Sequence, residues 1–213
     1  MQQGEFGNKR EDSGTSDYNA VMFVIQQALN SVQTISLVKV VAVTNDGGIT
    51  PVGTVDVIPL VNQLTGDNKQ VPHGVVYKLP YFRLQGGTNA IILDPQVGDI
   101  GMCAFASRDS SVVRKTKNQG PPGSRRKFSF SDGLYFGGML NGTPVQFVRF
   151  SEEGVEVTSP TQVTINAPDI VQNGHVTING QLTQVSADGA SFSHTATAGI
   201  DVVAAGVSLV THV

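Results

Sequence analysis

The side chains of this chain that could perform chemistry are few and scattered. They are four histidines and one cysteine: His73, His175, His194, His212 and Cys103. His175 and His194 stand in a stretch of alternating apolar residues, where three symmetry-related copies could bring imidazoles together; a solvent-facing position is the simpler alternative. Cys103 lies in the strand-like run GDIGMCAFAS, which predicts a buried, unreactive thiol. A single cysteine also excludes a disulfide within the chain.

Sequence motifs typical of enzymes are missing. The chain contains no G-x-S-x-G, no H-E-x-x-H and no glycine-rich phosphate-binding loop. The adjacent acids Glu152 and Glu153 are better explained as part of a hinge than as a glycosidase site, because a glycosidase needs two carboxyl groups on either side of a bound sugar. We therefore expect a protein that is not an enzyme.

Charge divides the chain into two bodies. The 213 residues include 14 basic and 17 acidic ones, but residues 151–213 contain no Lys or Arg. No run is long and apolar enough to cross a bilayer, and the N-terminus is polar. We predict a flexible arm over residues 1–16, a head over 17–150 and a separate tail over 151–213.

The head is predicted to be mostly β, with one short N-terminal helix. The helix covers residues 17–32, is capped by Ser16 or Asp17, and carries apolar residues at three- and four-residue spacing. Strand patterns follow at 34–44, 53–61, 75–84, 90–95, 98–106 and 144–150, separated by turn sequences. This number of short strands favours a small closed barrel. Residues 131–142 suggest a short helical or turned piece.

A basic cluster lies between two of these strands, in a segment longer than a simple connection needs. It contains Arg114, Lys115, Lys117, Arg125, Arg126 and Lys127. The cluster could dock on an acidic protein surface or stay solvated. It lacks the aromatic residues that stack on bases, so we expect no nucleic-acid partner.

The tail alternates apolar and polar residues, as a half-buried strand does. The predicted core positions are Val155, Val157, Val163, Ile165, Val176 and Ile178. The alternation changes phase repeatedly, which a flat sheet would not tolerate. A single copy of the tail has no other element against which to bury these residues. Three copies that wind around a threefold axis would bury them against one another, so we predict an intertwined, homotrimeric β-helix.

This order of parts resembles the central spike proteins of contractile phage tails, which are similar to the VgrG spikes of type VI secretion. The sequence LDPQVGDIGMCAFASRDSS at 93–111 resembles the family's barrel motif, and the matching residues are Pro95, Gly98, Asp99, Arg108 and Asp109. The resemblance implies an OB-fold-like barrel (the oligonucleotide/oligosaccharide-binding type), a trimeric β-helical shaft and a narrow tip. It also implies a place in the virion, at the baseplate under the tail tube.

The resemblance further implies partners and a function. The partners are tail tube and baseplate proteins, and the host outer membrane that the spike pierces when the tail contracts. Several members carry His-x-His at the tip and bind iron there; His212 matches the first of these histidines. A solvent-exposed terminal histidine is the alternative. The alternative function is a trimeric tail fibre or adhesin that binds a cell-surface glycan.

Overall fold

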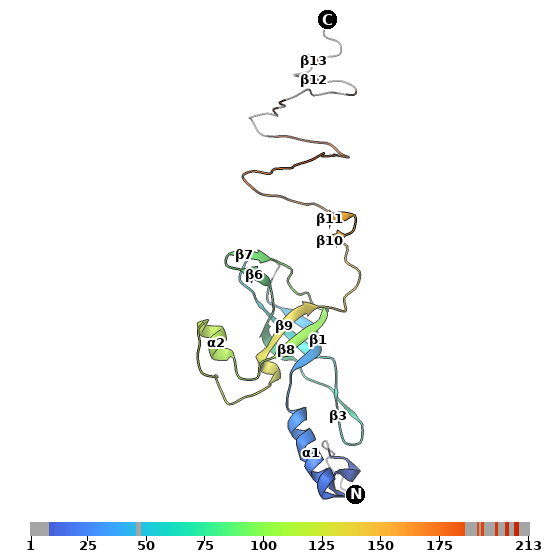
Figure 1. The fold of residues 1–213 in the computed structure, drawn as a ribbon, viewed down its shortest axis with the longest axis vertical. Helices are drawn as coiled ribbons and strands as arrows, with labels where there is room; N and C mark the ends of the chain where they lie inside the picture. Colours follow the sequence, from blue (N-terminus) through green and yellow to red (C-terminus); the bar gives the residue numbers. More distant parts are fainter. Residues whose placement is uncertain are drawn as a thin grey trace.

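The computed structural model describes residues 9–45 and 48–185, the single residues 191, 193 and 199, and the strand residues 203–204 and 207–208. Figure 1 shows an elongated molecule with α1 near one end, a curled sheet in the middle, and an extended ribbon leading to the other end. The fold is mostly β with few helices, as the sequence predicts.

The N-terminal part forms the predicted helix. A 3-10 turn, η1 (Glu11–Gly14), precedes α1 (Asp17–Asn30), and the Ser16 side chain accepts a hydrogen bond from the Asn19 amide as N-cap. Ser31 ends the helix, and its amide donates to the carbonyls of Ala28 and Leu29. The chain then enters the sheet.

The central sheet has five strands in the order β5-β2-β1-β8-β9, and all of its pairings are antiparallel. The strands are β1 (Ile35–Val43), β2 (Thr54–Pro59), β5 (Val76–Pro80), β8 (Ile100–Phe105) and β9 (Gly133–Gly138). Bulges in the β1–β2, β2–β5 and β8–β9 pairs increase the local twist. The sheet therefore curls into a half-barrel. Its edge strands meet at one isolated bridge, between Tyr81 and Tyr135.

The core lies inside this curl. Buried and partly exposed residues alternate along β2 and β8, so each strand turns one face inward. The buried apolar residues are Val38, Val40, Val55, Val57, Leu79, Tyr81, Cys103, Phe105 and Tyr135. The predicted burial of Cys103 is confirmed, and desolvation raises the pKa of its thiol to about 12.

Short elements surround the sheet. They are the hairpins β3 (Gln63–Leu64) with β4 (Gln70–Val71) and β6 (Leu84–Gly86) with β7 (Asn89–Ile91), the helix α2 (Ser111–Thr116) and the 3-10 turn η2 (Phe130–Asp132). Two more hairpins follow the head: β10 (Phe147–Ser151) with β11 (Gly154–Thr158), and β12 (Val203–Ala204) with β13 (Val207–Ser208).

The expectation for residues 131–142 holds only at their start. Ser131 and Asp132 lie in the 3-10 turn η2, but the residues that follow form β9, an edge strand of the sheet. The basic segment contains a helix, α2. The expected hinge at Glu152 and Glu153 is the two-residue turn between β10 and β11, where Ser151 pairs with Gly154. Gly154 supplies the positive φ, +129°, that follows this turn.

Candidate functional site

The shaft, residues 154–185, differs from the rest of the described chain in that most of its backbone is extended without belonging to a strand. It begins as β11 and then runs back and forth across the long axis of the molecule (Figure 1). No strand is present from residue 159 to 185. Residues 159–183 make no backbone–backbone hydrogen bond with any other described residue. Two amides of this stretch, those of Thr161 and Gln162, donate to the Ser159 hydroxyl. An extended chain whose amides and carbonyls make no ladder hydrogen bonds can accept strands on both of its edges.

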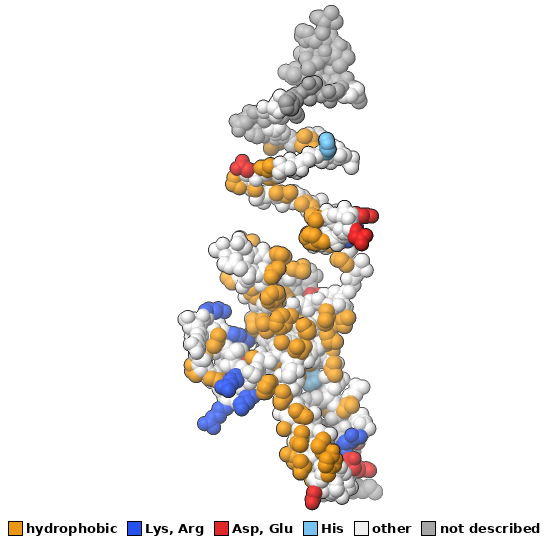
Figure 2. Space-filling model, in the orientation of Figure 1, with side chains coloured by type: hydrophobic (Ala, Val, Ile, Leu, Met, Phe, Trp, Pro, Cys, Tyr) orange, Lys and Arg blue, Asp and Glu red, His pale blue; other side chains and the backbone are white. Residues whose placement is uncertain are grey.

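The apolar residues of the shaft are exposed in the single chain. All six predicted core positions are described, and each is more than half exposed: Val155, Val157, Val163, Ile165, Val176 and Ile178. Figure 2 shows hydrophobic side chains along this ribbon and across the head below it. One copy therefore leaves both the backbone and the apolar face of the shaft without a cover.

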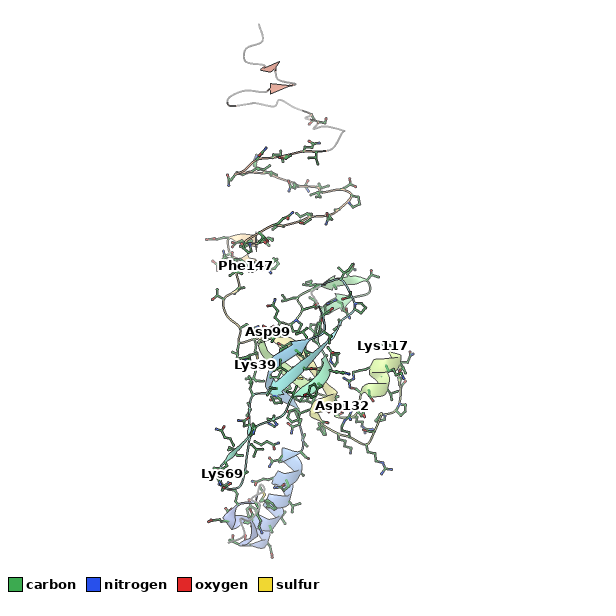
Figure 3. All side chains as sticks on the ribbon, turned by 180° about the vertical axis from the view of Figure 1, so that it is seen from behind. Lys39, Lys69, Asp99, Lys117, Asp132 and Phe147 are labelled. Atoms are coloured by element: carbon green, nitrogen blue, oxygen red, sulfur yellow. The ribbon has the colours of Figure 1, made fainter. Side chains whose placement is uncertain are left out.

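The β10–β11 hairpin joins the head to the shaft. Arg149 pairs with Glu156 across the two strands, and their side chains form an ion pair with an N–O distance of 2.5 Å. Phe150 faces Val155 in the same ladder, and both are exposed. Phe147 lies at the base of the shaft (Figure 3). The hairpin thus begins the exposed apolar face that the shaft continues.

The turn of the barrel motif is fixed against β1. Gly98 has φ +102°, and its amide donates to the Val40 carbonyl at 2.9 Å. The Val40 amide donates in return to the Asp99 carbonyl at 2.9 Å, and the Asp99 carboxylate accepts from the Gln96 amide at 2.8 Å. Pro95 lies in the same loop, beside a surface cavity of about 520 Å³. Gly98 and Asp99 therefore position the loop before β8.

The end of the barrel motif forms part of a buried ionic network. Asp109 accepts hydrogen bonds from the Ser111 amide at 3.0 Å and the Ser124 hydroxyl at 2.7 Å, and it pairs with Arg126 at 3.1 Å. The hydrogen bonds from Ser111 and Ser124, together with the charge of Arg126, lower the pKa of Asp109 to about 2. Arg108, its neighbour in the motif, is exposed.

Asp132 holds the other side of the same network. Its carboxylate has no exposed surface; it accepts from Arg126 Nε at 2.8 Å and from the Ser110 amide at 3.2 Å. Arg114 lies 3.8 Å away. Figure 3 shows Asp132 close to the sheet and Lys117 out on α2. The basic cluster is thus two groups: Arg126, with Arg114 beside it, ties the loop to the head, while the exposed Lys115, Lys117, Arg125 and Lys127 face solvent.

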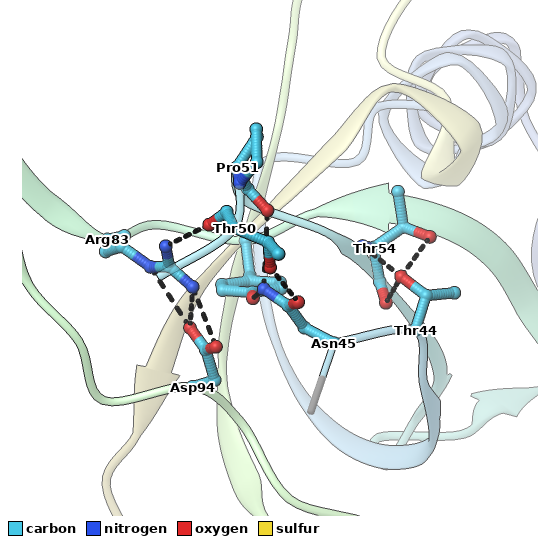
Figure 4. Close-up of polar contacts among 8 residues, drawn as sticks. Thr44, Asn45, Thr50, Pro51, Thr54, Arg83 and Asp94 are labelled. Carbon is cyan, nitrogen blue, oxygen red and sulfur yellow. Dashed lines mark hydrogen bonds and ion pairs between the residues drawn. The ribbon is translucent and has the colours of Figure 1, made fainter. Parts of the chain in front are cut away.

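A second buried ion pair fastens the loops above the sheet (Figure 4). The Arg83 and Asp94 side chains are only 4% and 6% exposed, and Arg83 Nη2 lies 2.6 and 2.7 Å from the two carboxylate oxygens. Arg83 Nη1 also donates to the Thr50 carbonyl at 2.7 Å. Hydrogen bonding to Asp94 raises the pKa of Arg83. Sequence reasoning missed this pair, because the partners are 11 residues apart and no motif links them.

One buried polar atom has no partner in the described part of the protein. It is the Tyr135 hydroxyl oxygen, enclosed in the core. Desolvation raises the pKa of this phenol to about 12. The backbone carbonyl of Tyr135 does have a partner: it accepts a hydrogen bond from the Phe82 amide at 2.6 Å. This hydrogen bond closes the half-barrel.

The two histidines in the described part of the chain are not brought together. His73 packs edge-on against Phe130, with ring centroids 5.1 Å apart, and its Nε2 lies 3.0 Å from the Val61 carbonyl. His175 is exposed on the shaft. His194 and His212 lie outside the described residues. Among the residues that are described, no three His, Cys, Asp or Glu side chains are grouped to hold a metal ion.

Neither a known protein family nor a curated protein matches the sequence. Within the described residues, no helix has the length and apolar character needed to span a bilayer.

Proposed function

We propose that this protein is the homotrimeric central spike of a contractile phage tail or a related injection system, which pierces the bacterial outer membrane when the tail contracts. The observation that carries the proposal is the shaft: an extended ribbon in which residues 159–183 make no backbone–backbone hydrogen bond with other described residues, and in which Val and Ile side chains are exposed. Three such ribbons around one axis would pair their backbones and bury their apolar faces together.

Such a shaft suits a mechanical task. Hydrogen bonds that run between three chains would leave no free sheet edge, and a dry axial core would resist buckling under compression. The tail contains no Lys or Arg, so its acids keep its surface negative before contraction. The spike would then act through its mechanical rigidity, and the protein would not be an enzyme.

The head fits the proposed base of the spike. Its curled half-barrel sheet and the turn at Gly98 and Asp99 support the resemblance to an OB-fold-like barrel. Exposed lysines and Arg125 around α2 offer a surface for acidic tail tube or baseplate proteins. Iron at the tip, bound through His212, stays a prediction from the resemblance; imidazole is a suitable ligand for a divalent transition metal.

One observation favours the alternative, a trimeric fibre or adhesin that binds a glycan. Phe82 and Phe136 lie on the head with ring centroids 6.0 Å apart, both partly exposed. They line the 520 Å³ cavity beside Asp94, and partly exposed aromatics can stack on sugars. The shaft offers no such surface, because the only aromatic residue after Phe150 is Phe192.

The position of the protein in the particle distinguishes the two functions. Gold-labelled antibodies against the head should bind contractile particles on the tail axis, at the distal end of the tube. The fraction labelled there should fall to background in particles from a strain that lacks the gene. Labelling on fibres at the periphery of the baseplate would contradict the spike and support the adhesin.

A further inference from the structure

Helix α1 has no buried residue, although most of its side chains are apolar. Among the described residues, its main neighbour is the turn η1. This turn folds back against one side of the helix, where the Asn19 side chain donates to the Asp12 carbonyl at 3.1 Å and to the Thr15 hydroxyl at 2.8 Å. Met22 and Phe23 are half-buried there. No other described element covers the remaining sides of the helix, which lies at the end of the molecule opposite the shaft (Figure 1).

The uncovered side carries apolar residues at the spacing of a coiled coil. The residues are Tyr18, Val21, Ile25 and Ala28, separated alternately by three and four positions, and all four are exposed. This is the a/d pattern of the heptad repeat. Val24 and Leu29 flank the stripe and are also exposed. The only charged residue of the helix is Asp17, in its first turn, so no charge interrupts the stripe.

The direction of α1 is set by its attachment to the head. The Gln33 amide donates to the Phe128 carbonyl at 3.2 Å, and the Phe105 amide donates to the Thr34 carbonyl at 2.8 Å. Few residues therefore separate the helix from the first hydrogen bonds to the rest of the head. A threefold rotation about the shaft would place three copies of α1 in parallel, at the same end of the molecule.

We propose that the α1 helices of three copies pack against one another as a short, parallel, three-stranded coiled coil. The occupant of the apolar stripe is thus a second and a third copy of the same chain. Ile25 at an a position and Val21 at a d position are β-branched, and β-branched residues at both positions favour more than two strands. This inference rests on the proposed homotrimer and continues its interface past the head.

The length of the helix explains why the shaft is needed as well. Fourteen residues make two heptads, which are too short to hold a stable assembly alone in water. Tethered to a trimeric shaft, the three helices would meet at high local concentration. The three heads would then be held together by the coiled coil at one end and by the shaft at the other.

Disulfide trapping in the full-length protein tests the proposal. The variants are Ile25→Cys and Ala28→Cys at core positions, with Gln26→Cys as the matched control on the outer side of the same helix. The native Cys103 is buried and its pKa is raised to about 12, so it stays unreactive. After mild copper-catalysed oxidation, Ile25→Cys and Ala28→Cys should form a covalent dimer of chains at least several-fold more than Gln26→Cys.

The oligomeric state, measured on the same samples by light scattering, separates the two levels of the argument. A trimer whose core and control variants cross-link equally would overturn the coiled coil and leave the spike intact. A trimer with no cross-linking at any position would do the same, and would assign the stripe to a different partner. A monomer would overturn the coiled coil together with the proposed homotrimer.

Discussion

At the residue scale, the buried carboxylates Asp109 and Asp132 hold the loops of the head through ion pairs, whereas His73, the single histidine of the head, packs on Phe130. Asp109 belongs to the sequence motif that suggested a barrel, and the structure gives it a physical role. It accepts hydrogen bonds from two serines and pairs with Arg126, and these contacts tie the start of α2 and residues 124–126 of the following loop to one carboxylate. No sequence pattern indicates that Arg126 would complete this network, because the pairing depends on how the loop folds back.

The pKa of Asp109 predicts a dependence of stability on pH. The pKa is about 2 in the folded protein, below the ordinary value of 3.8, so the folded state binds its proton less tightly than the unfolded state does. The contribution to stability is therefore complete above pH 4 and is lost as the pH falls towards 2. Melting curves of the wild type and of Asp109→Asn should differ at pH 5 and converge near pH 2. A difference that persists unchanged at pH 2 would contradict this role.

Arg125 and Arg126 are neighbours with different roles, which a pair of charge reversals can separate. Arg126→Glu would place a third carboxylate beside Asp109 and Asp132, so the melting temperature of the head should fall by more than about 4 °C. Arg125→Glu is the matched control on the solvent-facing side and should change it by about 1 °C at most. Equal melting temperatures for the two variants would show that the network does not hold the loop.

At the element scale, periodicity predicted strands well where one face is buried. The patterns at 34–44, 53–61 and 98–106 correspond to β1, β2 and β8, which lie in the middle of the sheet. The missed strand, β9, has the sequence GLYFGG, and its three glycines resemble a turn. Its strand conformation comes from pairing with β8 and from burial of Tyr135, which are tertiary contacts that a local pattern does not contain.

The shaft makes a prediction at the same scale. Ile165→Asp would place three carboxylates near one axis without counter-charges, and burying an unpaired charge costs several kcal/mol in proteins. Assembly should fail for this variant. Thr164→Asp is the matched control, because adjacent residues of an extended strand point to opposite sides. Size-exclusion chromatography should find the control assembled as the wild type is.

Two outcomes would change the account of the shaft. If both aspartate variants assemble with unchanged melting, residue 165 faces solvent in the assembly. If only Thr164→Asp fails, the apolar residues point outward and the register is shifted by one residue.

At the scale of the whole molecule, the apolar surface is the unifying feature. It extends from α1 over the head to the shaft ribbon (Figure 2). The uneven charge of the sequence indicated two bodies, and the thin apolar face of the tail pointed to an assembly of identical chains. The sequence could not indicate how far an interface would extend over the head, because that depends on which face of the curled sheet each loop leaves uncovered.

The central claim is that three copies of this chain form one spike, and the solution mass tests it most directly. Multi-angle light scattering of the full-length protein should give three times the 22.5 kDa of a single chain. The mass should stay the same on dilution, because interwoven chains cannot separate without unfolding. A mass of one chain, with the shaft exposed as it is in the single copy, would contradict the account.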